Sequence, residues 1–145
     1  MAAMTVKDIM TRNVITVGPD TSLMDVSKLL LEKRISGIPV VNPDGKLVGI
    51  ITLSDMLKVL DRIYKWKELE KQDSDLKVSG KFEQEKEKAR VKDFMTTEIL
   101  TLKEEDTLDH VRKKMFVNKV HTLPVVNNDR IVGIVGKRDL VKACF

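Results

Sequence analysis

The sequence predicts a mixed α/β (α+β) fold in which two βαββα units pack about a pseudo-two-fold axis. Segment 6–60 aligns with 91–144 with a single one-residue gap, and 19 of the 54 aligned positions are identical. Each copy holds short apolar runs typical of strands and one apolar stripe typical of a helix. A unit this small has difficulty burying both faces of its own sheet, so we expect the two copies to share one core, with grooves where they meet.

Each copy begins with a short run that suits a strand, residues 14–17 (VITV) and 99–102 (ILTL). Apolar residues then recur at i, i+3 and i+7, which places one stripe on a helix of about three turns. The stripe residues are Leu23, Val26 and Leu30, and Leu108, Val111 and Met115. Side chains suited to an N-cap precede both helices: Asp20 or Ser22, and Asp106 or Thr107.

The next part of each copy predicts an antiparallel hairpin. Two apolar runs, Ile38–Val41 and Leu47–Ile51, flank the turn sequence Pro43-Asp44-Gly45. The second copy repeats this pattern around its own polar turn. A second helix is expected to begin near Ser54–Asp55 and again near Asp139, which completes the order β-α-β-β-α.

A highly charged connector without a counterpart separates the copies. We therefore divide the chain into a first repeat (1–60), a connector (61–90) and a second repeat (91–145). The helix that begins near Asp55 is expected to continue into the connector, because apolar residues keep a helical spacing there. These residues are Met56, Leu60, Ile63 and Trp66.

Farther along the connector, Asp73-Ser74-Asp75 and Ser79-Gly80 predict breaks, and Phe82 to Arg90 predicts a second short helix. The connector is either a partly helical, solvated spacer or a docking arm that carries Tyr64 and Trp66.

Composition restricts the class of protein. The chain has 145 residues, a net charge of +4, 33% charged residues and six aromatic residues. This mixed charge, with few aromatic stacking platforms, does not favour nucleic acid as a partner. No uncharged apolar run exceeds five residues, whereas a membrane-spanning helix needs about 18 or more, and the N-terminus lacks the apolar region of a secretory signal. We expect a soluble, cytoplasmic protein.

Motifs for catalysis or metal binding are missing from the sequence. It contains no P-loop, HExxH, CxxC or nucleophile elbow. A single cysteine, Cys144, and two histidines make a metal centre an unfavourable interpretation. We expect neither enzymatic activity nor a required cofactor or metal.

Two segments of each copy suit a ligand, and the first is Ser36–Val41. Gly37 lets the backbone approach a flat ligand closely, and Pro39 fixes the chain entering the strand.

The second segment, Gly49–Asp55, runs from a strand into a helix, whose N-terminus favours phosphate. Thr52 and Ser54 add hydroxyl donors, and Asp55 can accept two hydrogen bonds from a ribose. These features together predict a nucleoside or nucleotide pocket. The alternatives are structural: Ser54 as an ordinary N-cap, Asp55 as a favourable charge in the first turn, and Gly49 as a bulge or a close strand contact.

The duplicated segments DIMT (8–11), GIPVVN (37–42) and GIITLSD (49–55) resemble a pair of CBS domains, also called the Bateman module. The resemblance covers 6–60 and 91–144, nearly everything but the connector. It implies a small-molecule sensor that binds AMP, ADP, ATP or S-adenosylmethionine in the grooves between the repeats, and pairing into a disc-like homodimer.

The resemblance also implies binding residues in each groove. Those of the first groove are Ile15, Thr16, Gly37, Ile38, Pro39, Thr52, Ser54 and Asp55. Those of the second are Leu100, Thr101, His121, Thr122, Leu123, Pro124 and Asp139. In this family the two aspartates bind ribose, the segments around the prolines enclose the purine, and His121 lies where a relative uses a phosphate-facing histidine.

The second copy departs from the family pattern, because Gly136-Lys137-Arg138-Asp139 replaces Thr52-Leu53-Ser54-Asp55 and both hydroxyls are lost. Arg138, with Lys119 and His121, can supply charge to a phosphate, or else that groove is empty and Arg138 is solvated. We therefore rank the Asp55 groove ahead of the Asp139 groove.

Two functions remain open from the sequence. The first is a regulatory module for energy sensing that binds an adenosyl ligand and passes a conformational change to a protein partner. The alternative is a ligand-independent dimerisation or interaction scaffold whose charged connector docks on a protein or nucleic acid.

Overall fold

The computed structural model describes residues 3–72 and 87–145, except the side chains of Trp66, Glu70 and Gln72. The predicted breaks at 73–75 and 79–80, and most of the helix predicted over 82–90, lie outside the described residues. No helix in the described part of the chain is long and apolar enough to cross a membrane.

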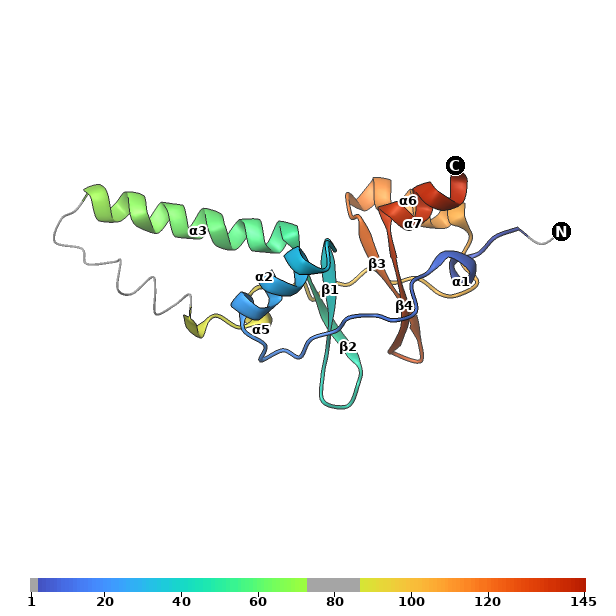
Figure 1. Cartoon of the computed structure of the whole chain (residues 1–145), viewed down its shortest axis with the longest axis horizontal. Helices are drawn as coiled ribbons and strands as arrows, with labels where there is room; N and C mark the ends of the chain where they lie inside the picture. The colour runs from blue at the N-terminus through green and yellow to red at the C-terminus, as the bar shows by residue number, and fades with distance from the viewer. Residues whose placement is uncertain (1–2, 73–86) are drawn as a thin grey trace.

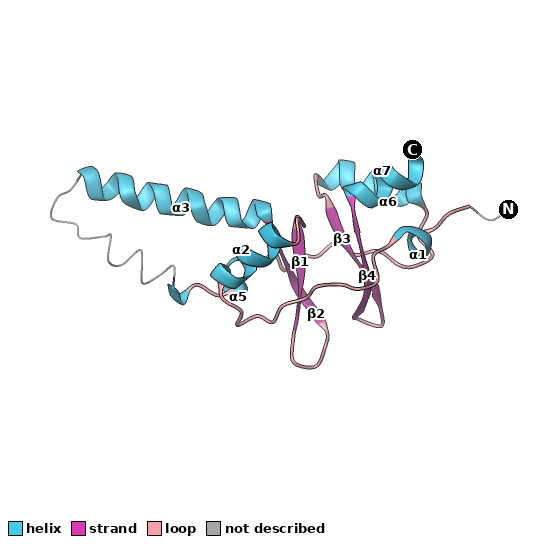
Figure 2. Ribbon diagram, in the orientation of Figure 1, coloured by secondary structure: helices cyan, strands magenta, loops and turns pink. Residues whose placement is uncertain are grey.

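The described elements match the predicted αββα part of both repeats, and each repeat also begins with a short helix that was not predicted from the sequence (Figures 1 and 2). Those of the first repeat are α1 (Val6–Ile9), α2 (Leu23–Glu32), β1 (Gly37–Val41), β2 (Leu47–Thr52) and α3 (Leu53–Gln72). Those of the second are α5 (Val91–Phe94), α6 (Leu108–Asn118), β3 (Thr122–Asn127), β4 (Arg130–Gly136) and α7 (Lys137–Cys144). As predicted, α3 continues into the connector, and Figure 1 shows it projecting beyond the hairpins.

Both predicted hairpins are confirmed: β1 pairs antiparallel with β2, and β3 with β4. The register shifts by one residue after Val40 and, equivalently, after Val125. The turns differ, which accounts for the one-residue gap between the copies. Gly45 takes a left-handed φ of 81° in the first turn, whereas Asn128 and Asp129 take φ of 52° and 64° in the second, a conformation that Asn and Asp tolerate better than most residues.

The strands predicted over 14–17 and 99–102 are wrong in extent. Each run forms one parallel bridge, Val17 with Val40 and Leu102 with Val125. Val17 and Leu102 are nevertheless each buried in a core.

The helix caps resolve two alternatives left open by the sequence. Ser22 caps α2, where its Oγ accepts from the N–H of Asp25 at 3.1 Å. Thr107 caps α6, where its Oγ1 accepts from the N–H of His110 at 3.1 Å. Asp20 instead accepts from the Nζ of Lys92 at 2.9 Å, and this ammonium group lowers the pKa of the Asp20 carboxyl.

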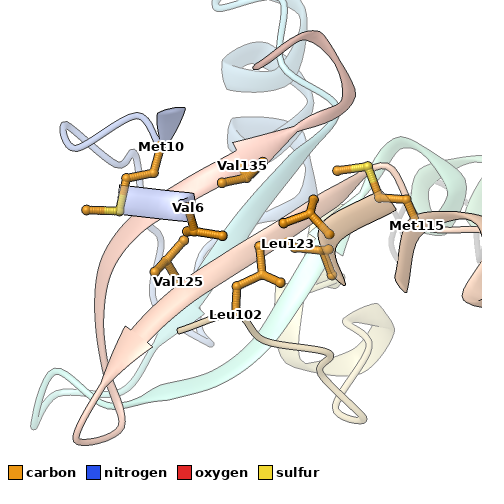
Figure 3. Packing of buried hydrophobic residues seen from close by; sticks show 8 residues of the cluster. Val6, Met10, Leu102, Met115, Leu123, Val125 and Val135 are labelled. Atoms are coloured by element: carbon orange, nitrogen blue, oxygen red, sulfur yellow. The ribbon is translucent and has the colours of Figure 1, made fainter. Parts of the chain in front are cut away.

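Buried apolar side chains in the described residues form two clusters rather than the single shared core expected from the sequence. Each cluster receives a short helix from the other repeat. Val6 and Met10, in and just after α1, pack into the second repeat (Figure 3). Val91, which begins α5, packs into the first. Figure 1 accordingly shows α1 beside β3 and β4, and α5 beside α2.

Backbone hydrogen bonds hold this exchange in place with pseudo-two-fold symmetry. The N–H of Val6 donates to the carbonyl of Asp106 at 2.9 Å, and at the equivalent place the N–H of Val91 donates to Thr21 at 2.9 Å. Thr11 pairs with Ile134 at 2.9 and 3.0 Å, and Thr96 pairs with Ile50 at 2.9 and 2.8 Å. Each sequence repeat therefore supplies part of the other's core.

The exchange explains two glycines, since Gly49 lies against Met95 and Gly133 lies against Met10, each from the other repeat. A Cβ on Gly133 would lie 2.4 Å from Sδ and 2.8 Å from Cγ of Met10. Gly49 thus makes a close contact, with the Met95 side chain rather than with a strand, and it also pairs with Val40 next to the register shift of the hairpin.

Gly133→Ala is expected to lower the free energy of unfolding by about 1–3 kcal/mol, because the buried Met10 must move. Denaturant unfolding measures the loss. In a Met10→Ala background the same substitution is expected to cost much less, and an equal cost in both backgrounds would contradict the contact.

Candidate functional site

The candidate site lies where β1 and β3 begin, next to the pseudo-two-fold axis. Ser36 Oγ and Thr122 Oγ1, from different repeats, are hydrogen-bonded at 2.6 Å. A Cβ on Gly37 would lie 3.3 Å from Cγ2 of Thr52 and 3.5 Å from Cβ of Thr122. The tighter of these two neighbours belongs to the same repeat, whereas the Thr122 distance is an ordinary van der Waals contact.

Asp55, in the first turn of α3, is the buried charged residue of the described part of the chain, with 4% of its surface exposed. Its Oδ2 accepts from the N–H and from the Oγ1 of Thr52, both at 2.9 Å. Thr52 Oγ1 in turn accepts from the N–H of Asp55 at 3.2 Å, which completes a capping box. Asp55 Oδ1 accepts from Oγ1 of Thr96 at 3.1 Å. Asp55 therefore caps α3 and also joins the two repeats.

Asp139 occupies the equivalent place in α7 but has fewer partners. Its Oδ2 accepts from the N–H of Gly136 at 2.8 Å. No hydrogen bond within the described residues uses its Oδ1, and the residue is half-buried. Gly136 has no hydroxyl to bond Oδ2, and no described residue bonds Oδ1 as Thr96 bonds Asp55, so more of the Asp139 carboxylate is free of partners among the described residues.

The two predicted grooves also differ in charge. Lys137 and Arg138, which begin α7, are exposed, and so is His121, whose carbonyl accepts from the N–H of Lys137 at 3.0 Å. Lys119 adds no difference, because the aligned Arg34 is also basic and exposed. The positions aligned with Lys137 and Arg138 in the first repeat carry Leu53 and Ser54, which bear no charge. Phosphate groups are therefore favoured electrostatically at the second groove.

The remaining predicted residues differ in burial. Ile38, Leu123, Pro39 and Pro124 are buried, so a ligand there would meet backbone more readily than side chains. Those that are half-buried are Ile15, Thr16, Leu100, Thr101 and Thr122.

Sequence reasoning missed two residues beside the site. Thr96 bonds Asp55, and the Nζ of Lys114 donates to the carbonyl of Thr101 at 2.5 Å. Thr96 stood within the repeated DIMT and DFMT motif, but the motif does not say which repeat it contacts. No group of three or more His, Cys, Asp or Glu side chains in the described ranges could hold a metal ion.

The duplicated sequence and the fold define a tandem-repeat protein of the CBS type. The CBS domain family model matches residues 6–62 and 91–145, and the chain belongs to this family. Protein MJ1426 of Methanocaldococcus jannaschii is 35% identical over 97% of this chain and 90% of its own length. The L-aspartate semialdehyde sulfurtransferase of the same organism is 32% identical over 93% of this chain, which spans only 22% of that enzyme.

Two solved structures with bound adenosyl compounds have the same fold. The CBS domain pair of protein MJ0100, in complex with 5'-methylthioadenosine and S-adenosyl-L-methionine, is 30% identical with a TM-score of 0.76, over 99% of this chain and 97% of that one. CBSX2 of Arabidopsis thaliana, in complex with AMP, is 28% identical with a TM-score of 0.75, over 98% of this chain and 96% of that one.

Proposed function

We propose that this chain is a regulatory module that binds an adenosyl ligand, either an adenine nucleotide (AMP, ADP or ATP) or S-adenosylmethionine, in the grooves between its CBS repeats. The observation that carries the proposal is the pair of carboxylates, Asp55 and Asp139, in the first turns of α3 and α7 beside the inter-repeat contact. A carboxylate accepts the two hydroxyl hydrogens of a ribose, and the relatives that bind adenosyl compounds share this fold.

The regulatory part of the proposal follows from the exchanged helices. A ligand that binds one arrangement of the repeats better than another shifts the population toward it. Because each core contains part of the other repeat, a change at one groove reaches both halves and can pass to a protein partner. We infer no catalysis by this chain, since its match to the sulfurtransferase spans only 22% of that enzyme.

We also infer that the chain forms a homodimer. Exposed apolar residues recur at aligned positions of the two repeats: Leu31 with Phe116, and Leu57 with Val141. They lie on α2, α6, α3 and α7, and Figure 2 shows α3, α6 and α7 at the end of the hairpins opposite the turns. Sedimentation of the purified chain tests this proposal.

The double variant Asp55→Asn, Asp139→Asn is expected to weaken adenosyl-ligand binding by tenfold or more, because hydrogen bonds to a charged group contribute about 1.5–3 kcal/mol each. Titration calorimetry with AMP and with S-adenosylmethionine measures the change, and GTP serves as the non-adenosyl ligand. Asp109→Asn, at an exposed carboxylate paired with Arg112, is the control. Equal affinities of wild type, control and double variant would remove both aspartates from the site.

A further inference from the structure

The two carboxylates assigned to ribose differ in how much of their hydrogen-bonding capacity the protein already uses. A carboxylate accepts about four hydrogen bonds. Asp55 accepts three within the chain and is 4% exposed. Asp139 accepts one from the described residues and is half-buried. A ribose that donates two hydroxyls therefore fits Asp139 without displacing a protein group, whereas at Asp55 one existing donor must leave.

Thr96 is the donor that can leave Asp55 at the lowest cost. The two bonds from Thr52 close the first turn of α3, and a helix N-terminus that loses its cap is destabilised. Thr96 lies on an exposed segment, and its hydroxyl can turn to water while its backbone stays paired with Ile50 at 2.8 and 2.9 Å.

Thr11 provides a natural comparison within the same chain. It aligns with Thr96, and its backbone pairs with Ile134 in the same way, at 2.9 and 3.0 Å. Within the described residues, however, its hydroxyl forms no hydrogen bond with Asp139. The same backbone arrangement thus occurs once with the carboxylate bonded and once without.

We propose that the Thr96 hydroxyl is a latch on Asp55, which makes the two ligand sites inequivalent. An adenosyl ligand fills the Asp139 groove first and reaches Asp55 only when Thr96 releases it. Thr96 is a positioning residue from the second repeat, so occupancy of the first-repeat site is reported directly to the second repeat. This proposal rests on the proposed function and reverses the ranking of the two grooves made from the sequence.

The test compares Thr96→Val with Thr11→Val in a background that carries Asp139→Asn. This background substitution isolates the Asp55 site, and the asparagine side chain keeps an oxygen that can accept from the Gly136 N–H. Titration calorimetry with AMP, and separately with 5'-methylthioadenosine, gives the affinity. Thr96→Val is expected to tighten binding about tenfold, equivalent to about 1.4 kcal/mol. It is also expected to lower the melting temperature without ligand, because Asp55 loses a donor. Thr11→Val is expected to change neither the ligand affinity nor the melting temperature, and Thr96→Ser is expected to behave as wild type.

Unchanged or weaker binding by Thr96→Val overturns the latch. This includes the case in which the melting temperature falls but the affinity does not change, because that result is expected if Thr96 has a purely structural role. If the Asp139→Asn background binds neither probe, the latch predicts that Thr96→Val restores binding, and no recovery overturns it. If the wild-type protein binds the probes but Thr96→Val restores no binding, the latch is overturned and the proposed function stands. If neither the wild type nor any variant binds, both the latch and the proposed function are overturned.

Discussion

Replacing Val6 and Met10 together by alanine is expected to destabilise the second repeat, which lies about a hundred positions away in the sequence. Both side chains are buried, at 0% and 8% exposure, in a cluster with Leu123 and Val125. Truncating them removes buried apolar volume that nothing else in that core can fill. We expect a loss of about 4 kcal/mol, a large share of the roughly 5–15 kcal/mol by which a domain is stable.

Hydrogen exchange read by mass spectrometry locates this effect. Amides of β3 and β4 are expected to lose protection before those of β1 and β2. Met4→Ala is the control, since this methionine at the same end of the chain is exposed. Protection lost first from β1 and β2 would contradict the exchanged arrangement.

Asp55→Ala is expected to lower the free energy of unfolding by about 3 kcal/mol. It removes the acceptor of three hydrogen bonds, two that cap α3 and one from Thr96, and bonds to a charged group contribute about 1.5–3 kcal/mol each before the freed donors find other partners. Asp139→Ala removes the acceptor of one such bond and is expected to cost about 1 kcal/mol.

Denaturant unfolding of the two alanine variants gives both numbers under identical conditions. The pair is matched, because the same substitution is made at aligned positions of two repeats. Similar losses would mean that the hydroxyls of Thr52 and Thr96 add nothing to the fold, and would also weaken the case for the latch.

The features that recur within each repeat were predictable from the sequence. The alignment of the two copies located both hairpins, and the apolar spacing of Leu23, Val26 and Leu30 located α2, because these signals depend on neighbours a few positions away. The alignment also placed Asp55 and Asp139 in the first turns of equivalent helices. Local patterns of this kind report secondary structure and burial but not which copy supplies the contact.

The features that required the structure are those that cross between repeats. Val6 and Val91 follow the same local pattern whether they pack on their own copy or on the other. The Thr96 bond to Asp55 was missed for the same reason, as was the contact of Met10 with Gly133. The short runs 14–17 and 99–102 have strand-like composition, yet each forms a single bridge, since such composition reports burial and packing rather than the length of the ladder.

The central claim, that the chain binds an adenosyl ligand, is tested most directly by melting the purified protein with AMP, ADP, ATP, S-adenosylmethionine, NADH and GTP in turn. A ligand present at about 100 times its dissociation constant adds about 2.7 kcal/mol of stability, which raises the melting temperature measurably. We expect a selective rise with at least one adenosyl compound and none with GTP. No rise with any adenosyl compound at millimolar concentration, in protein that mass spectrometry shows to be free of bound nucleotide, would contradict the claim and favour a ligand-independent scaffold.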